Sequence, residues 1–259
     1  MQNVEAVLLD IDGVLVTSWE PLPGAVETIS WLRKNDVPFR LITNTTTHTR
    51  GALAKTLADA GIAVSANEIV TAVVATGSYL RMAHPGARVF VLSDGDARSD
   101  LEGVDVVDDE ADVVVLGGAY EGFDYSTMNR VFRMLTDGAS LVAMHRNMYW
   151  RTNEGLQLDG GAYVAALEAA TGSRAVVCGK PAREYFMSAL DGLGASAERT
   201  AMVGDDLESD VIGAQDAGLI GVLVRSGKFR QDVLDRSDRK PDFTIDSIAR
   251  VLDLIAPSS

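Results

Sequence analysis

Short apolar runs alternate with amphipathic stretches along the first part of the chain. Val7-Leu8-Leu9 is an apolar run that stops at polar residues, which predicts a strand buried on both faces. Residues 24–35 place apolar side chains at three-residue spacing, which predicts a helix. A strand at 39–42 and a helix at 47–60 follow. This alternation predicts an α/β fold, a doubly wound parallel sheet with right-handed crossovers.

The middle of the chain has an alternation of its own. We predict helices at 73–83, 125–136 and 161–171, and strands at 88–92, 104–107, 111–116 and 140–144. The first rhythm then returns, with strands at 175–178, 200–203, 220–224 and 243–245, and helices ending near 190, at 209–217 and at 246–255. The charge-rich residues 232–240 suggest a solvated loop. We therefore predict a core domain at 1–76 and 177–259 and an inserted α/β domain at 77–176.

Composition excludes several classes of protein. The 259 residues are 47% hydrophobic and 23% charged, as in ordinary globular proteins. The formal net charge of −14 disfavours nucleic acid as a partner. One cysteine, Cys178, rules out an intramolecular disulfide, and its apolar surroundings suggest a buried, inert thiol. With no signal-peptide pattern and no apolar run long enough to span a membrane, we expect a cytoplasmic protein with no membrane partner.

Polar residues follow four of the predicted strands. They are Asp10 and Asp12 before Gly13, Thr43 with Asn44, Lys180, and Asp205 with Asp206, to which Asp210 is added one turn later. Ligands of open parallel sheets bind beyond the carboxyl ends of the strands, so these groups should meet in one crevice. Each feature alone is also an ordinary turn, helix cap or surface lysine.

Together these groups favour phosphoryl-transfer chemistry. Asp10, Asp12 and Asp205 offer oxygen ligands that suit Mg²⁺. Thr43 and Lys180 can bind the oxygens of a tetrahedral anion. Positioning and charge neutralisation do most of the work in phosphoryl transfer. An aspartate that acts as an acid near neutral pH needs a raised pKa, and burial is one way to raise it.

The order of these motifs resembles the haloacid dehalogenase superfamily of phosphatases. The sequences Asp10-Ile11-Asp12-Gly13, Thr43-Asn44, Lys180-Pro181 and Gly204-Asp205-Asp206-Leu207-Glu208-Ser209-Asp210 carry the resemblance, which covers the whole chain. The inserted section resembles the α/β cap of the NagD-like subgroup. Thr43–Thr46 and Ala143–Tyr149 are most similar to the branch of phospholysine phosphohistidine inorganic pyrophosphate phosphatase and its hydrolase-domain relatives. That branch often has serine where Asp12 stands, and the aspartate favours ordinary phosphatase chemistry.

The resemblance implies a role for each residue. Asp10 is the nucleophile that forms a phosphoaspartyl intermediate, and Asp12 is the general acid and base. Magnesium is held by Asp10, the carbonyl of Asp12 and Asp205, while Asp206 or Asp210 acts through water or orients these ligands. Phosphate oxygens are bound by Asp10, Ile11, Asp12, Thr43, Asn44 and Lys180, and Lys180 also neutralises charge on Asp10.

The inserted domain is expected to be a lid that carries substrate selectivity. Its candidate contacts are His145, Arg146, Asn147 and Tyr149, with the turn at 158–161, although His145 can equally be a packing residue. The resemblance also makes a homodimer through the cap plausible.

These observations predict a Mg²⁺-dependent phosphatase acting on small phosphorylated metabolites. Hydrolysis of pyrophosphate or of phosphorus–nitrogen bonds is an alternative. A receiver-like phosphoacceptor domain is a third possibility, because such domains use the same residue types. They need only about 120 residues, however.

Overall fold

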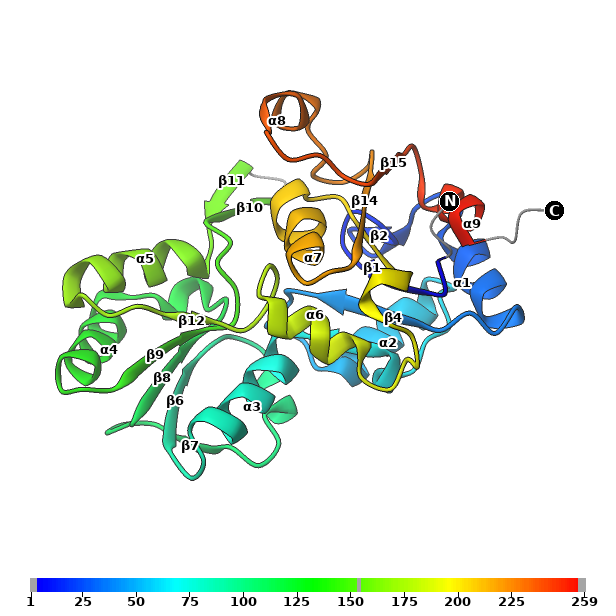
Figure 1. The fold of residues 1–259 in the computed structure, drawn as a ribbon. Helices are drawn as coiled ribbons and strands as arrows, with labels where there is room; N and C mark the ends of the chain where they lie inside the picture. The colour runs from blue at the N-terminus through cyan, green and yellow to red at the C-terminus, as the bar shows by residue number, and fades with distance from the viewer. Residues whose placement is uncertain (1–3, 153–154, 256–259) are drawn as a thin grey trace. The chain divides into compact units, whose positions relative to one another are not determined.

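The computed structural model of the protein describes residues 4–152 and 155–255 and divides into two compact units (Figure 1). The first unit comprises residues 1–43, 51–70 and 180–259. The second comprises residues 44–50 and 71–179. The second unit is thus inserted into the first.

A six-stranded sheet forms the centre of the first unit, in the order β15-β14-β13-β1-β4-β5. Strands β1, β4, β13, β14 and β15 are joined by parallel pairings, as predicted. The strands are β1 (Ala6–Asp10), β4 (Phe39–Thr43), β5 (Ile69–Thr71), β13 (Thr200–Gly204), β14 (Ile220–Val224) and β15 (Phe243–Ile245). A two-stranded ribbon, β2 (Val16–Thr17) and β3 (Glu20–Pro21), follows β1.

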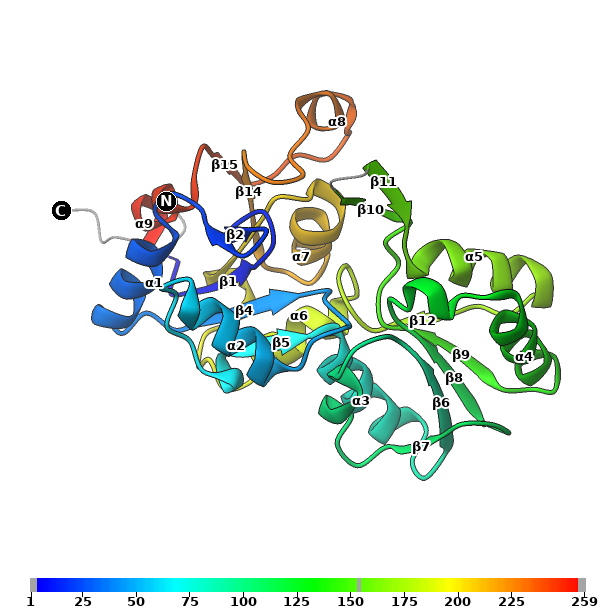
Figure 2. The same ribbon diagram turned by 180° about the vertical axis from the view of Figure 1, so that it is seen from behind.

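Helices cover both faces of this sheet (Figures 1 and 2). They are α1 (Ala25–Lys34), α2 (Arg50–Asp59), α6 (Arg183–Leu190), α7 (Gly213–Asp216), α8 (Gln231–Arg236) and α9 (Leu252–Ile255). Alternate residues of β14 explain why both faces need cover, because side chains on a strand point alternately to its two sides. Val222 and Val224 join the cluster that includes α1, whereas Leu223 packs with Val211 and Ile212.

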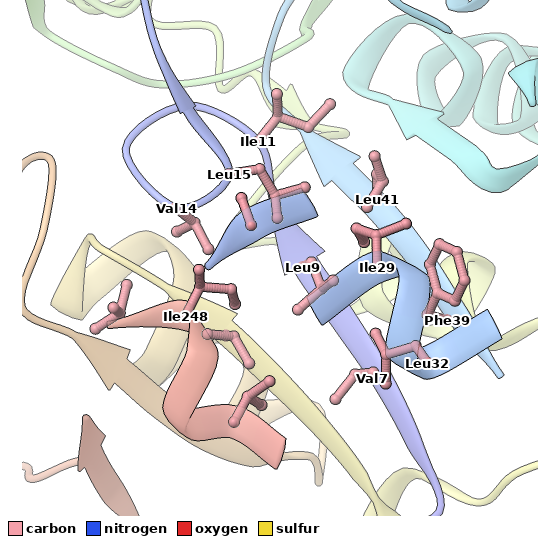
Figure 3. Packing of buried hydrophobic residues seen from close by; sticks show 14 of the residues in the cluster. Val7, Leu9, Ile11, Val14, Leu15, Ile29, Leu32, Phe39, Leu41 and Ile248 are labelled. Carbon is pink, nitrogen blue, oxygen red and sulfur yellow. The ribbon is translucent and has the colours of Figure 1, made fainter. Parts of the chain in front are cut away.

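The larger apolar cluster lies between β1, β4 and α1 (Figure 3). Ile29 and Leu32, one helical turn apart, pack with Leu9 of β1 and Leu41 of β4. The predicted three-residue spacing in this helix therefore marks its buried face. Trp19 is partly buried against the same cluster, so it packs under its loop.

The second unit has its own sheet of five parallel strands, in the order β12-β9-β8-β6-β7. The strands are β6 (Arg88–Leu92), β7 (Asp105–Val107), β8 (Val113–Leu116), β9 (Ser140–Ala143) and β12 (Val176–Val177). Its helices are α3 (Ala72–Ala83), α4 (Tyr125–Thr136) and α5 (Gly160–Thr171). The strands alternate between two apolar clusters, one with α3 and one with α4 and α5. Cys178 is buried in the α3 cluster, as predicted.

Several predicted boundaries differ from the structure. The predicted division at residues 76 and 77 falls inside α3, and the structure keeps this whole helix in the second unit. The helix predicted from residue 47 begins at Arg50. The helix predicted at 209–217 is a π-helix, Leu207–Ile212, followed by α7, and the one at 246–255 is a 3₁₀ turn, Ile248–Val251, followed by α9.

One segment was predicted with the wrong structure, and another element was not predicted. Residues 232–240, predicted as a loop, include most of α8, where Asp232 pairs with Arg236 one helical turn away. The antiparallel hairpin β10 (Tyr149–Thr152) and β11 (Gly155–Leu158) was not predicted. Among the described residues, no helix is long and apolar enough to cross a membrane.

Candidate active site

The carboxyl ends of three neighbouring strands form the floor of the candidate site. Leu9 of β1 is in register with Leu41 of β4 on one side and Val203 of β13 on the other. Asp10, Thr43 and Asp205, at or just beyond these strand ends, therefore lie along the same edge of the sheet. All three are buried.

Lys180 joins two of the carboxylates. Its Nζ lies 2.6 Å from Oδ1 of Asp10 and 2.7 Å from Oδ1 of Asp210. All three side chains are buried, with exposed fractions of 4%, 8% and 1% respectively. Removing one member of such a cluster would leave an unpaired charge away from water.

Asp205 is held by two loops that approach it closely. Its Oδ2 accepts a hydrogen bond of 2.6 Å from the backbone N–H of Lys228. A Cβ on Gly13 would lie 2.0 Å from this oxygen, and a Cβ on Gly227 would lie 1.9 Å from it. Both glycines also have positive φ. Glycine is therefore required at both positions, for space as well as for backbone conformation.

Asp206 and Asp210 are arranged by the π-helix that follows β13. Oδ1 of Asp206 accepts hydrogen bonds from the backbone N–H groups of Glu208 and Ser209, both 3.0 Å long, and so caps the helix. The N–H of Asp206 donates to Oδ2 of Asp210 at 3.1 Å. Asp206 thus shapes the turn, while Asp210 presents its other oxygen to Lys180.

Burial and mutual repulsion shift the titration of this cluster. Burial, together with the charges of Asp10 and Asp210, raises the pKa of Asp205 to about 8. Burial also raises the pKa of Asp210 to about 6, and it raises the pKa of Asp10, although Lys180 opposes both shifts. Burial acts to lower the pKa of Lys180, but Asp10 and Asp210 raise it well above the ordinary value. The cluster carries more negative charge than Lys180 alone can compensate.

Two family models match the chain, and the first of them extends into the inserted unit. A haloacid dehalogenase-like hydrolase model matches residues 7–107, and a HAD-hydrolase-like model matches residues 177–251. Human haloacid dehalogenase-like hydrolase domain-containing protein 2 is 38% identical over 252 residues, covering 97% of this chain and 96% of that protein. The chain belongs to the haloacid dehalogenase-like hydrolase family.

Two further similarities place the hydrolase within this family. It is 34% identical to rat phospholysine phosphohistidine inorganic pyrophosphate phosphatase over 261 residues, covering 98% of this chain and 95% of that protein. The solved structure of NagD from E. coli K-12 matches with a TM-score of 0.86 and 28% identity, covering 95% of this chain and 98% of that one. The resemblance to the NagD-like subgroup is thereby confirmed.

The acidic cluster of the hydrolase fits a divalent cation. Asp10, Asp205 and Asp210 each offer an oxygen, and these oxygens lie within 4.8 Å of one another. Oδ1 of Asp205 is buried without a hydrogen-bond partner among residues 4–152 and 155–255. Closely spaced carboxylate oxygens of this kind are the donors that Mg²⁺ prefers.

Asp12 differs from its neighbour Asp10 in environment. Strand β1 ends at Asp10, the chain bends at Ile11, and Asp12 is exposed whereas Asp10 and Ile11 are buried. The structure therefore does not bury Asp12, although burial is the means that we expected for tuning the acid. The charge of Asp12 is close enough to raise the pKa of Asp10 further.

The backbone at Thr43 is held by Tyr185, which the sequence did not reveal. The Tyr185 hydroxyl accepts a hydrogen bond of 3.0 Å from the N–H of Thr43. The same hydroxyl lies 2.9 Å from the carbonyl oxygen of Thr43 and 2.8 Å from that of Val70, and it donates to one of them. Burial raises the pKa of this phenol, so it stays protonated and able to donate. The sequence gives little indication of this contact, because Tyr185 is 142 residues away from Thr43 along the chain.

The remaining candidates belong to the second unit, which is described by itself. Asn44 is grouped with this unit. His145 is buried, with Nε2 at 3.6 Å from Oδ1 of Asp159 and Nδ1 accepting from the N–H of Asn147. Arg146 forms a close ion pair with Glu168. His145 and Arg146 thus have structural partners within the unit, while Tyr149 is 57% exposed.

The loop after β14 also reaches the cluster and was not predicted as part of it. Ser226 Oγ donates a hydrogen bond of 2.6 Å to the carbonyl oxygen of Gly13, and Lys228 contacts Asp205 as described above. The sequence does contain an indication that this loop belongs to the site, because polar residues directly follow Val224, the end of a fifth strand.

We expect Tyr185→Phe to lower the free energy of unfolding by about 1–3 kcal/mol, because it removes hydrogen bonds to buried backbone groups of Thr43 and Val70. Urea unfolding of wild type and variant measures the difference. Tyr125→Phe is the matched control, since Tyr125 is 86% exposed. Equal losses in the two variants would contradict the role assigned to the Tyr185 hydroxyl.

The raised pKa of Asp205 predicts a pH dependence of the metal-free hydrolase. Between the ordinary pKa of 3.8 and about 8, native Asp205 retains a proton that the unfolded chain releases. The free energy of unfolding should therefore fall as pH rises through this window. Urea unfolding in a chelator, from about pH 5 to about pH 8, measures the slope, and Asp205→Asn should reduce it. The exposed Asp36→Asn should leave it unchanged. A slope that is identical in all three proteins would refute the prediction.

Proposed function

We propose that the chain is a Mg²⁺-dependent phosphatase that hydrolyses small phosphorylated metabolites through a phosphoaspartyl intermediate. The observation that carries this proposal is the buried cluster in which Lys180 contacts Asp10 and Asp210 beside Asp205. The similarity over nearly the whole chain to a protein named as a phosphatase supports it.

Asp10, the backbone carbonyl of Asp12 and Asp205 would hold the magnesium ion. Bound there, Mg²⁺ would reduce the repulsion between Asp10 and the negatively charged phosphoryl group. We earlier assigned Asp210 an indirect role. Because its carboxylate lies with those of Asp10 and Asp205, it is also a candidate ligand.

Asp10 and Asp12 divide the chemistry between them. A carboxylate oxygen of Asp10 attacks phosphorus, and the bond from phosphorus to the leaving oxygen breaks while Asp12 donates a proton to that oxygen. Asp12 then takes a proton from a water molecule as the water attacks phosphorus. The bond from phosphorus to Asp10 breaks, which releases phosphate and restores the carboxylate. The exposed position of Asp12 supports this role, because its carboxyl group is accessible to water and to a leaving group.

Other groups bind and orient the phosphoryl oxygens. Lys180 supplies a fixed positive charge beside Asp10, and we expect the Thr43 hydroxyl and the backbone of Ile11 and Asn44 to donate hydrogen bonds. Tyr185 fixes the Thr43 backbone, so the hydroxyl is carried by a segment that does not need to reorganise.

Hydrolysis of pyrophosphate or of a phosphorus–nitrogen bond is the second candidate. It is favoured by the similarity to the rat phosphatase whose name includes phospholysine, phosphohistidine and pyrophosphate. The phosphoacceptor alternative is disfavoured, because the chain belongs to a hydrolase family and contains a large inserted unit. A role of the inserted unit in substrate selection stays a prediction, as does a homodimer.

Asp10→Asn should reduce hydrolysis of p-nitrophenyl phosphate by at least about a thousandfold, because the amide cannot act as the nucleophile. Removing magnesium from the wild type should have a comparable effect. Steady-state turnover with and without the ion measures both. Equal activity of wild type and variant would rule out the proposed mechanism.

Asp12→Asn serves as a companion variant. It should slow turnover by about 10²–10⁴-fold for a poor leaving group such as an alkyl phosphate, and less for p-nitrophenolate, which leaves without needing a proton. An equal loss for both leaving groups would contradict the role of Asp12 as the acid.

A substrate panel separates the two candidate functions. We expect phosphate monoesters to be turned over faster than imidodiphosphate and phosphohistidine, since the chain has an aspartate at position 12. Phosphate release from each compound at equal concentration measures the order, and the reverse order would favour the second candidate.

Tyr149→Ala tests whether the inserted unit contacts the substrate, because loss of such a contact predicts a change in KM that differs between substrates.

A further inference from the structure

Lys228 is placed beside the acidic cluster by two short hydrogen bonds in its loop. Its backbone N–H donates to Oδ2 of Asp205 at 2.6 Å, and two residues earlier Ser226 Oγ donates to the carbonyl oxygen of Gly13, also at 2.6 Å. Between them, Gly227 approaches so closely that a Cβ there would lie 2.5 Å from Cα of Gly13. The root of the Lys228 side chain is therefore fixed against the carboxylates.

The ammonium group of Lys228 differs from that of Lys180. Lys180 is buried and committed to Asp10 and Asp210. Lys228 is exposed, and no ion pair involves it in the part of the chain that the structure describes. An exposed lysine is positively charged at neutral pH, so Lys228 offers an accessible ammonium group on a backbone that is held against the cluster.

The charges of the site indicate the role of Lys228. With a divalent cation bound, the charges of Asp10, Asp205 and Asp210 are compensated by the cation and by Lys180. A phosphoryl group then brings negative charge that this arrangement does not offset. Because Coulomb attraction grows with the charge of the ligand, an additional ammonium matters most for the most highly charged substrates. A lysine is suited to this task, as a compact charge on a flexible stem.

We infer that Lys228 is a specificity-determining residue that favours substrates with a second phosphate attached to the phosphoryl group that is transferred. The inference rests on the proposed phosphatase function and deepens it. It assigns to one side chain outside the four predicted motifs a contribution to the binding of a second phosphate, whatever the order in which the site turns over its substrates.

Replacing the charge tests the inference directly. Lys228→Met removes the ammonium but keeps the backbone N–H that binds Asp205. We expect it to lower kcat/KM for pyrophosphate at least about tenfold more than kcat/KM for p-nitrophenyl phosphate, as loss of a charge-assisted contact would. Lys228→Arg should restore most of the difference. Lys34→Met, at an exposed lysine near the end of α1, is the matched control and should change neither value.

A binding measurement separates this inference from the proposed function. Calorimetric titration with methylenediphosphonate and with inorganic phosphate, both in magnesium, does not require turnover. We expect Lys228→Met to weaken binding of the diphosphonate at least about tenfold more than binding of phosphate. Equal weakening of both ligands, or of neither, would overturn the inference. If the wild type hydrolyses no phosphate compound, the proposed function fails, and the two titrations still decide the role of Lys228.

Discussion

The ammonium group of Lys180, buried between Asp10 and Asp210, is the interaction on which the rest of the first unit depends. A buried charge is tolerated only when it is well paired, so the loop before α6, the end of β1 and the π-helix must all hold their positions. The carboxylates outnumber the lysine, so the cluster retains negative charge that a further cation would compensate. A site built in this way is ready for a negatively charged substrate only after its own negative charge has been compensated.

The sequence was most informative where a functional residue directly follows a strand. Asp10, Thr43 and Asp205 could be placed together because parallel neighbouring strands end at one edge. The contact of Asp210 with Lys180 was not predictable, since it depends on the π-helix that follows β13. Tyr185 was missed for a related reason, because its partners are distant in sequence and no local pattern marks it. Lys228 was missed although the polar residues after β14 follow a fifth strand end.

The threonine-rich run after β4 shows how little local sequence says about long-range partners. Thr43–Thr46 reads as a helix cap, but α2 starts only at Arg50. The hydroxyl of Thr46 instead accepts a hydrogen bond of 2.8 Å from the N–H of Gly118, and Ser93 Oγ donates to the Thr46 carbonyl oxygen at 2.9 Å. Within four residues the chain passes from the edge of one sheet to the loops of another. The threonine-rich run therefore contributes residues to both units, so its composition does not show where one unit ends and the other begins.

The chain leaves the first unit after Thr43 and after Val70, and it returns at Gly51 and at Lys180. The hydroxyl of Tyr185 bonds to the backbone at both points of departure. Three of the four points at which the insert is attached are therefore anchored by contacts that belong wholly to the first unit. Loops whose ends are fixed tolerate changes in length and sequence at small entropic cost. During evolution the inserted unit can thus diverge, or be replaced by one of different shape, while the residues proposed for the chemistry keep their positions.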